Sequence, residues 1–138
     1  MKRWSLCLFL LLLLPLTACQ QAGEPIVLPE PAELDKIQIE HSLVPAQMKI
    51  LETEENMAAL IDALTAQGKK TRTESVNDNP TNVDSYYTLK FYHTDAPKSP
   101  SIAYAYEKNG KTYIEQPYAG IWEIPDAIYD EQIEVTYD

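Results

Sequence analysis

The sequence contains little cysteine and little glycine, and each shortage excludes a class of protein. Its two cysteines are Cys7 and Cys19, so both lie within the first 19 of 138 residues. The rest of the chain therefore has no disulfide, no thiolate metal ligand and no cysteine nucleophile. Four glycines in all leave little material for the glycine-rich loops that bind phosphate groups. A domain in this chain must be held together by its hydrophobic core.

Positive charge is also scarce. The 11 lysine and arginine residues stand against 21 aspartate and glutamate residues, which gives a net charge of −10. Such an acidic chain repels a phosphate backbone, so we expect no nucleic-acid partner. It gains no attraction from anionic lipid headgroups either. The acids are scattered along the chain rather than grouped, which is typical of a solvated surface rather than of a site for one cationic partner.

The patterns that carry catalysis or metal binding are missing as well. Only His41 and His93 could act as imidazole bases, and the side chains of His41 and Ser42 are expected on opposite faces of a strand. There is no His-Glu-x-x-His pattern, no dinucleotide fingerprint and no nucleophile elbow. Residues 77–82 are rich in oxygen ligands but lack EF-hand spacing, so we interpret them as a turn. We therefore expect no catalytic residue, no metal site, no cofactor and no enzymatic activity.

The first 18 residues have the layout of a secretory signal. Lys2 and Arg3 form a positive start, residues 4–14 are almost all apolar, and Pro15 breaks the run. This apolar run of about eleven residues is shorter than the roughly twenty that a membrane-spanning helix needs. Residues 1–18 are therefore predicted to be a signal peptide rather than a permanent transmembrane helix.

The signal ends on Leu16-Thr17-Ala18-Cys19, which resembles the lipobox of bacterial lipoproteins at all four positions. In that family the cysteine receives a diacylglycerol, a peptidase cuts before it, and the acylated cysteine becomes the N-terminus. The resemblance implies that Cys19 is the lipid attachment site and that the chain is anchored on the extracytoplasmic side of the cell membrane. Two acyl chains give stable anchoring, whereas one is marginal. The alternative is a secreted protein with a chance cysteine.

Removal of the signal leaves a tether and one domain. Lys2 and Arg3 are lost with it, so the net charge moves from −10 to −12. Residues 19–33 carry three prolines among small and polar residues, a composition typical of an extended linker. We expect a signal peptide at 1–18, the lipidated cysteine with its tether at 19–33, and a single α+β domain at 34–138.

One amphipathic helix is predicted over Thr53–Gln67. Apolar side chains recur at helical spacing and form one stripe: Met57, Leu60, Ile61 and Leu64. Thr53 is expected to cap the first turn, and Gly68 is expected to end the helix in the left-handed conformation. A stripe of this kind beside strands is typical of a core-facing helix.

Alternating apolar and polar residues predict strands in the rest of the domain. The candidate segments are residues 37–43, 48–51, 70–76, 83–93, 102–106, 111–115 and 121–124, with a further one at 133–137. Residues 95–100, which hold two prolines, are predicted to be a loop, and Pro125 opens a short C-terminal helix. The predicted fold is an antiparallel sheet of about five strands with the Thr53–Gln67 helix on one face.

The Asn109-Gly110 pair predicts a two-residue hairpin and fixes its register. In that register Tyr106 faces Tyr113 and Tyr104 faces Glu115, which puts small residues on one sheet face and tyrosines on the other. The candidate binding surface consists of Tyr86, Tyr92, Tyr104, Tyr106 and Tyr113. Tyrosine is enriched at interfaces because it combines a large contact area with a polar tip. The alternative is that these side chains only pack across the sheet.

Residues 108–122, with Ser75–Pro80 upstream, are similar to a small extracytoplasmic domain of unknown function in lipoproteins of Gram-positive bacteria. The similarity covers roughly residues 34–131, the length of a typical single domain. Its motifs are structural turns, so it implies a location but no activity. We expect a membrane-anchored, non-catalytic module that binds a protein, a peptide or an envelope component. The alternatives are a ligand or signal sensor with a pocket between helix and sheet, and an acidic hydrolase.

Overall fold

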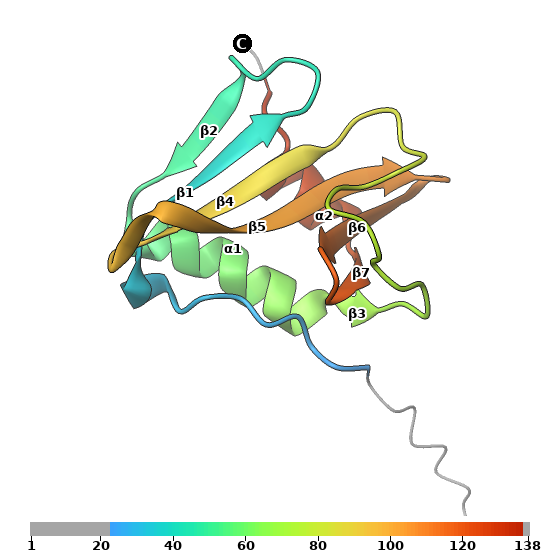
Figure 1. The fold of residues 1–138 in the computed structure, drawn as a ribbon, viewed down its shortest axis with the longest axis horizontal. Helices are drawn as coiled ribbons and strands as arrows, with labels where there is room; N and C mark the ends of the chain where they lie inside the picture. The colour runs from blue at the N-terminus through green and yellow to red at the C-terminus, as the bar shows by residue number, and fades with distance from the viewer. Residues whose placement is uncertain (1–22, 137–138) are drawn as a thin grey trace, which may run out of the picture.

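The computed structural model describes residues 23–136 as a seven-stranded antiparallel sheet with one long helix against it (Figure 1). Cys19 and the predicted signal peptide lie outside the described residues. The α+β class is confirmed. The expectation of about five strands is wrong, because short edge strands join the sheet on both sides.

The strands run antiparallel in the order β2-β1-β4-β5-β6-β7-β3. They are β1 (Leu34–His41), β2 (Met48–Leu51), β3 (Lys69–Lys70), β4 (Tyr87–His93), β5 (Ala96–Lys108), β6 (Lys111–Gln116) and β7 (Gly120–Ile124). The helices are α1 (Glu54–Gln67), α2 (Asp126–Ile128), the 3-10 turn η1 (Pro31–Glu33) and the π-helical turn η2 (Tyr129–Ile133). We call the sheet face toward α1 the inner face and the opposite one the outer face.

Helix α1 covers the inner face, as its apolar stripe predicts. All four residues of the stripe are buried: Met57, Leu60, Ile61 and Leu64. Ala103 and Ala105 on β5 are fully buried in the same core, and their small side chains let the helix lie close to the sheet. The Thr53 hydroxyl accepts a hydrogen bond from the Asn56 N–H at 3.2 Å, which confirms the predicted cap. Gly68 has a φ of −67°, so the predicted left-handed end is wrong; the chain extends directly into β3.

The β5–β6 hairpin forms as predicted. Asn109 and Gly110 have φ angles of 54° and 73°, the left-handed pair that a type I′ turn requires. Tyr106 pairs with Tyr113, and Tyr104 lies in register with Glu115.

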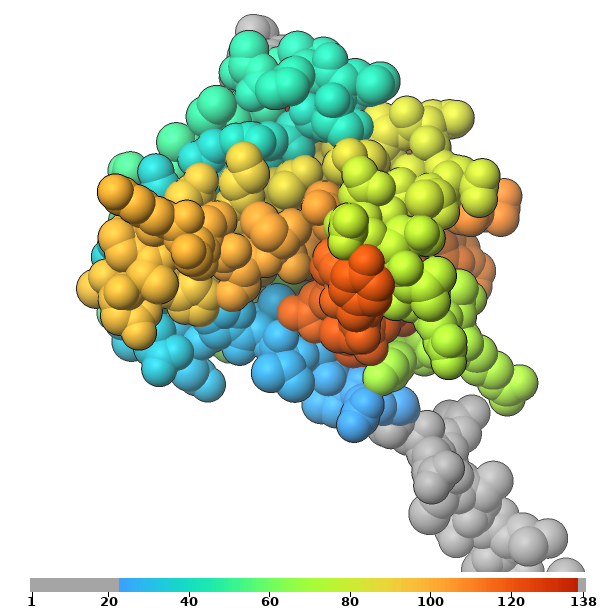
Figure 2. Space-filling model, in the orientation of Figure 1, coloured from blue at the N-terminus to red at the C-terminus, as the bar shows by residue number. Residues whose placement is uncertain are grey.

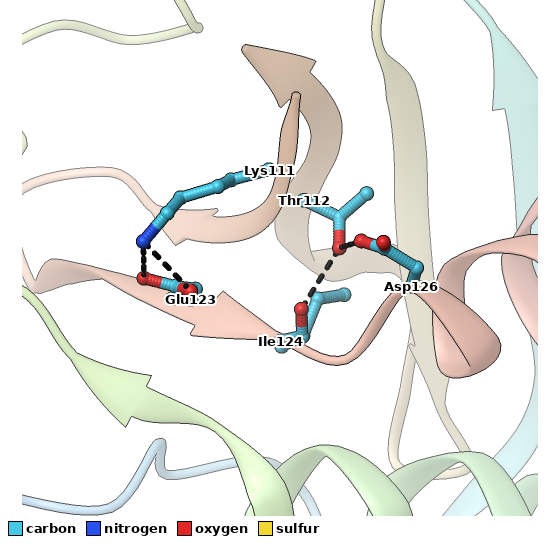
Figure 3. Close-up of polar contacts among 5 residues, drawn as sticks. All are labelled: Lys111, Thr112, Glu123, Ile124 and Asp126. Atoms are coloured by element: carbon cyan, nitrogen blue, oxygen red, sulfur yellow. Dashed lines mark hydrogen bonds and ion pairs between the residues drawn. The ribbon is translucent and has the colours of Figure 1, made fainter. Parts of the chain in front are cut away.

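Polar contacts hold β6 to β7 and to the start of α2 (Figure 3). The Lys111 ammonium lies 3.1 Å from both carboxylate oxygens of Glu123. The buried Thr112 hydroxyl lies 2.8 Å from the Ile124 carbonyl and 2.9 Å from the Asp126 carboxylate. Because this hydroxyl has a single proton, it donates to one of the two oxygens at a time.

Strand β5 begins at Ala96, so the loop predicted at residues 95–100 is wrong. Residues 97–100 have no register partner in β4, because the β4–β5 register shifts between the Ala96 and Ser101 pairs, and the β6 pairing reaches back only to Tyr104. Pro97 and Pro100 therefore lie in an unpaired stretch, where a missing N–H costs no ladder hydrogen bond.

The strand predicted at residues 70–76 is also wrong, because β3 ends at Lys70 and, among the described residues, only one further backbone hydrogen bond, from the Thr71 N–H to the Ile121 carbonyl, links the chain to β7. From Thr71 to Tyr86 the chain has no regular secondary structure and runs over the outer face beside β6 and β7 (Figures 1 and 2). We call residues 71–85 the covering loop. Its β-forming residues lack a neighbouring strand, and its side chains bind the sheet instead, as described below.

Part of the predicted tether belongs to the folded body. Ile26 is 2% exposed, and Leu28 packs against the same core. The Trp122 indole N–H donates to the Glu24 carbonyl at 2.8 Å. The Gln116 side-chain amide donates to the Val27 carbonyl, also at 2.8 Å. Residues 23–33 are thus not a free linker, because their apolar side chains help to close the core beside α1.

The strand predicted at residues 133–137 does not form in its described part. Ile133 is fully buried within η2, and Val135 packs partly against the core. The alternating apolar residues of this segment pack against the core and do not pair with a neighbouring strand.

Stability is expected to fall as the pH rises above about 10, where an unfolded tyrosine ionises. Burial, followed by the nearby Tyr87, raises the pKa of Tyr129 to about 12. Between these two values the folded state holds a proton that the unfolded state has lost, so rising pH favours unfolding. Urea unfolding followed by circular dichroism from pH 8 to 12 checks this. The Tyr129→Phe variant should lose less stability over this range, and an equal loss would contradict the assignment.

Candidate binding surface

The outer face of the sheet is divided into a covered half and an open half. The covering loop lies over β6 and β7, whereas β1, β2 and β4 carry outer side chains that remain partly exposed (Figure 2). The predicted tyrosines fall on both sides of this division. The structure therefore separates the side chains that hold the loop from those that remain partly open to solvent.

A buried carboxylate fastens the covering loop to the sheet. Glu115 on β6 is only 5% exposed, and it accepts hydrogen bonds from the Ser75 hydroxyl at 2.6 Å and the Tyr106 hydroxyl at 3.0 Å. Burial, with Glu115 as the next cause, raises the pKa of Tyr106 and keeps the phenol protonated as a donor. Tyr106 itself is 5% exposed, so of the five predicted tyrosines it is the one that the structure buries. The loop and its neighbours bury it.

The same loop holds the β6–β7 turn. The Tyr118 N–H donates to the Ser75 hydroxyl at 3.3 Å, and its phenol donates to the Asp78 carboxylate at 2.8 Å. Tyr118 has a φ of 62°, a left-handed conformation that costs a non-glycine residue on the order of 1 kcal/mol. Its ring is nonetheless 67% exposed, beside the exposed Val76. The sequence prediction did not include this exposed aromatic residue.

Three of the predicted tyrosines lie on the open half. Tyr86 and Tyr104 are partly exposed and meet edge-on, with ring centroids 5.3 Å apart. The Tyr86 backbone is fixed by two hydrogen bonds with Ser42 at the end of β1. Tyr92 is partly exposed, and the Lys36 ammonium lies 4.8 Å from its ring centroid. These rings are therefore both accessible and held in place before any partner binds.

A salt bridge stands among these aromatic residues on the outer face. The Lys90 ammonium of β4 lies 2.7 Å from the Glu40 carboxylate of β1, and the Gln38 amide contacts the same carboxylate. Partial burial, followed by the nearby Tyr86, raises the pKa of Tyr104, so the phenol stays protonated at neutral pH. The open half thus offers aromatic side chains around a compensated ion pair.

Tyr113 stands apart from the open tyrosines. It pairs with Tyr106 at a centroid distance of 5.7 Å and is partly exposed. Both rings line a surface hollow of about 270 Å³ together with Thr71, Thr73 and Ile121. A second hollow, of about 370 Å³, lies between residues 70–76 and 118–120. Both hollows are formed by the covering loop and not by the open half.

The centre of the interface between α1 and the sheet is filled by side chains, whereas a hollow of about 270 Å³ lies at its edge, lined by residues of β2, α1 and η2: Lys49, Leu51, Asn56, Ala59, Glu131 and Gln132. Leu60 and Leu64 of α1 and Leu89 and Ala103 of the sheet are all fully buried in one hydrophobic cluster. The hollows described above lie at the surface.

The structure contains a serine–histidine pair that the sequence pattern does not predict. The His93 Nε2 lies 2.6 Å from the Ser101 hydroxyl, because β5 begins early enough to bring Ser101 beside the end of β4. Within residues 23–136 no carboxylate is hydrogen-bonded to the other ring nitrogen, the position that orients a catalytic histidine. Among the same residues, no three His, Cys, Asp or Glu side chains gather in an arrangement that could hold a metal ion.

Residues 22–123 match a protein family described as "Domain of unknown function (DUF5300)". The chain belongs to this family. The family span contains α1, the covering loop and almost all of the sheet, including Ser75, Tyr106 and Glu115. The similarity seen in the sequence suggested a start near residue 34, whereas the family match starts at residue 22. This start is in keeping with the packing of Ile26 into the core.

One solved structure resembles this member of the family. It is an NMR structure of a protein from Ruminococcus gnavus, with 28% sequence identity and a TM-score of 0.60. The similarity covers 73% of this chain and 92% of that one. No curated protein matches the chain in sequence.

The described residues also bear on the membrane. Within residues 23–136, no helix is long and apolar enough to cross a bilayer.

Proposed function

We propose that this protein is an extracytoplasmic lipoprotein, anchored to the cell membrane through Cys19, whose domain is a non-catalytic binding module. The anchor is supported by the signal-peptide layout and by the lipobox at residues 16–19. The acidic net charge of −10 gives no attraction to anionic lipid, so the acyl chains must supply the membrane affinity.

The observation that carries the binding role is the set of open tyrosines on a rigid sheet. We call Tyr86, Tyr92 and Tyr104 the open tyrosines; each is partly exposed and already held by a ring or cation contact. A pre-ordered aromatic side chain loses little conformational entropy when a partner covers it. The partner class is a protein, a peptide or an envelope component, because a flat face with neutral phenols favours a broad contact over a small enclosed ligand.

Replacing the three open tyrosines by serine is expected to abolish capture of the partner. Each exposed aromatic residue at the centre of an interface contributes about 1–2 kcal/mol, so the triple variant should lose at least tenfold in binding. The measurement is cross-linking in cells, purification through a C-terminal tag, and quantification of captured proteins by mass spectrometry.

The matched control is Tyr118→Ser, which removes a tyrosine that is 67% exposed but lies outside the open set. It should leave capture unchanged. The binding role of the open tyrosines is contradicted if the triple variant captures the same proteins in the same amounts, or if it unfolds before any binding is lost.

A further inference from the structure

The edge segments of the described sheet include β2, β3 and the first half of β5, and the last two carry residues that block pairing. β3 is a pair of lysines, Lys69 and Lys70. The free half of β5 contains Pro97, Lys98 and Pro100. Lysine and proline at an edge are the usual means by which proteins prevent the addition of another strand. β2 differs, because the side chains it shows on the outer face are Met48 and Ile50.

The register shows which backbone groups of β2 are free. The His41 N–H donates to the Gln47 carbonyl, which makes this a hydrogen-bonded pair at the end of the β1–β2 ladder. Hydrogen-bonded and non-bonded pairs alternate in an antiparallel ladder. Counting along the register, Lys49 bonds to β1, whereas Met48 and Ile50 belong to non-bonded pairs. The N–H and C=O groups of Met48 and Ile50 therefore point away from the sheet, toward its free edge.

Four of the seven exposed large hydrophobic residues in the described part of the chain lie at this edge or in the connection to it. Leu43 and Val44, in the β1–β2 connection, are 69% and 40% exposed, and Met48 and Ile50 are each 43% exposed. Exposed apolar side chains next to unpaired backbone groups are the two features that an added strand uses: the backbone gives affinity and the side chains give specificity.

We propose that β2 is a docking edge, at which an extended basic segment of a partner protein pairs as an eighth strand. The inference rests on the proposed role as a binding module, but it uses the edge and not the open tyrosines. In Figure 1 the chain enters the fold near β3, and the β1–β2 connection lies at the opposite end of the molecule. An anchor at the N-terminus would thus leave this edge pointing away from the membrane.

The charge near β2 indicates which class of partner segment fits this edge. Lys49 donates to the Gln132 carbonyl at 3.0 Å, so its charge lies on the inner side of the sheet, away from the edge. Exposed acids follow β2 directly, at Glu52, Glu54 and Glu55. With a net charge of −10 for the whole chain, a segment that alternates apolar residues with lysine or arginine complements the edge.

A second copy of this chain is the less suitable occupant. Two copies would bring like net charges of −10 together. A strand of four residues spans only about 13 Å, which is too short to bury the roughly 1,200 Å² of a stable dimer interface on its own.

The test uses the full chain in non-ionic detergent and a fluorescent peptide that alternates lysine and valine over about eight residues, a common strand length. Fluorescence anisotropy gives the dissociation constant. Ile50→Pro removes an outward N–H and spares the hydrogen bonds to β1, so we expect binding to weaken at least tenfold. Ile50→Val keeps the N–H and the apolar character, and it should bind within twofold of the unchanged chain. A peptide methylated on alternate backbone nitrogens, which blocks pairing from the partner's side, should not bind even if Ile50→Pro fails to fold.

The remaining outcomes overturn the proposal in distinguishable ways. If the methylated peptide binds as well as the plain one, no strand is added. A glutamate–valine peptide that binds as tightly as the lysine peptide contradicts the basic partner, as does a lysine peptide that does not bind. If the open-tyrosine triple variant loses binding and Ile50→Pro keeps it, the peptide binds the outer face of the sheet. That result supports the proposed function and contradicts the docking edge at β2. Dimerisation that Ile50→Pro abolishes would make a second copy the occupant.

Discussion

Replacement of Glu115 by alanine is expected to lower the free energy of unfolding by about 3 kcal/mol. The substitution removes the acceptor of two hydrogen bonds, from the Ser75 and Tyr106 hydroxyls, and both bonds are buried. A buried hydroxyl without a partner retains its desolvation cost, so each orphaned donor adds to the loss. The covering loop would lose its main polar attachment to the sheet. Urea unfolding followed by circular dichroism measures the effect.

Two control variants separate the buried cluster from ordinary surface charge. Glu115→Gln keeps one acceptor oxygen and nearly the same shape, so it should cost only about 1 kcal/mol. Glu123→Ala removes a partly exposed carboxylate on the adjacent strand β7, whose partner Lys111 is largely exposed, and should change the unfolding midpoint little. If Glu115→Ala were no more destabilising than Glu123→Ala, the cluster would not be what holds the loop.

Replacement of Cys19 by alanine is expected to release the protein from the membrane or to leave it unprocessed. Lipid contributes about 0.8 kcal/mol for each buried methylene, so loss of the acyl chains removes nearly all membrane affinity. The domain cannot substitute for the lipid, because its negative charge is repelled by anionic headgroups. Fractionation into membrane and soluble material, with washing at high salt, measures the change.

The chain supplies its own control for this experiment. Cys7 is the only other cysteine and falls within the predicted signal peptide, so Cys7→Ala should be processed and anchored normally. The lipid attachment is contradicted if Cys19→Ala is still shortened to mature length and still bound to the membrane after the salt wash.

Features encoded by neighbouring residues could be predicted from the sequence. Helix α1 has its own stripe and its own cap at Thr53, and both formed as expected. The hairpin at Asn109-Gly110 has a turn that only a few residue types allow, which fixed the register of β5 with β6. In both cases the deciding interactions lie within a few residues of each other.

Features that depend on distant parts of the chain could not be predicted. Tyr106 has the alternation of an exposed residue, but it is buried by a loop whose Ser75 lies 40 residues from Glu115. Residues 71–76 have strand-forming side chains, yet no local signal in the sequence shows that the strand paired with β7 ends at Lys70. The two prolines before Ile102 predicted a loop, because nothing in the sequence shows that β5 continues through an irregular stretch opposite the end of β4.

One local signal could have identified the buried cluster. Glu115 falls on the tyrosine side of the hairpin, directly opposite Tyr104 in the predicted register. A carboxylate among aromatic residues needs hydrogen-bond donors when it is buried, and a tyrosine hydroxyl on the adjacent strand is a natural donor. This pattern would have placed Tyr106 against Glu115 rather than toward solvent.

The intact mass of the chain extracted from membranes shows directly whether Cys19 is lipidated. We expect a protein that begins at Cys19 and is heavier than the polypeptide by at least a diacylglycerol. A single mass measurement reports the cleavage site and the modification together. A membrane-extracted chain with an unmodified Cys19, or one that retains residues before it, would contradict the lipoprotein assignment.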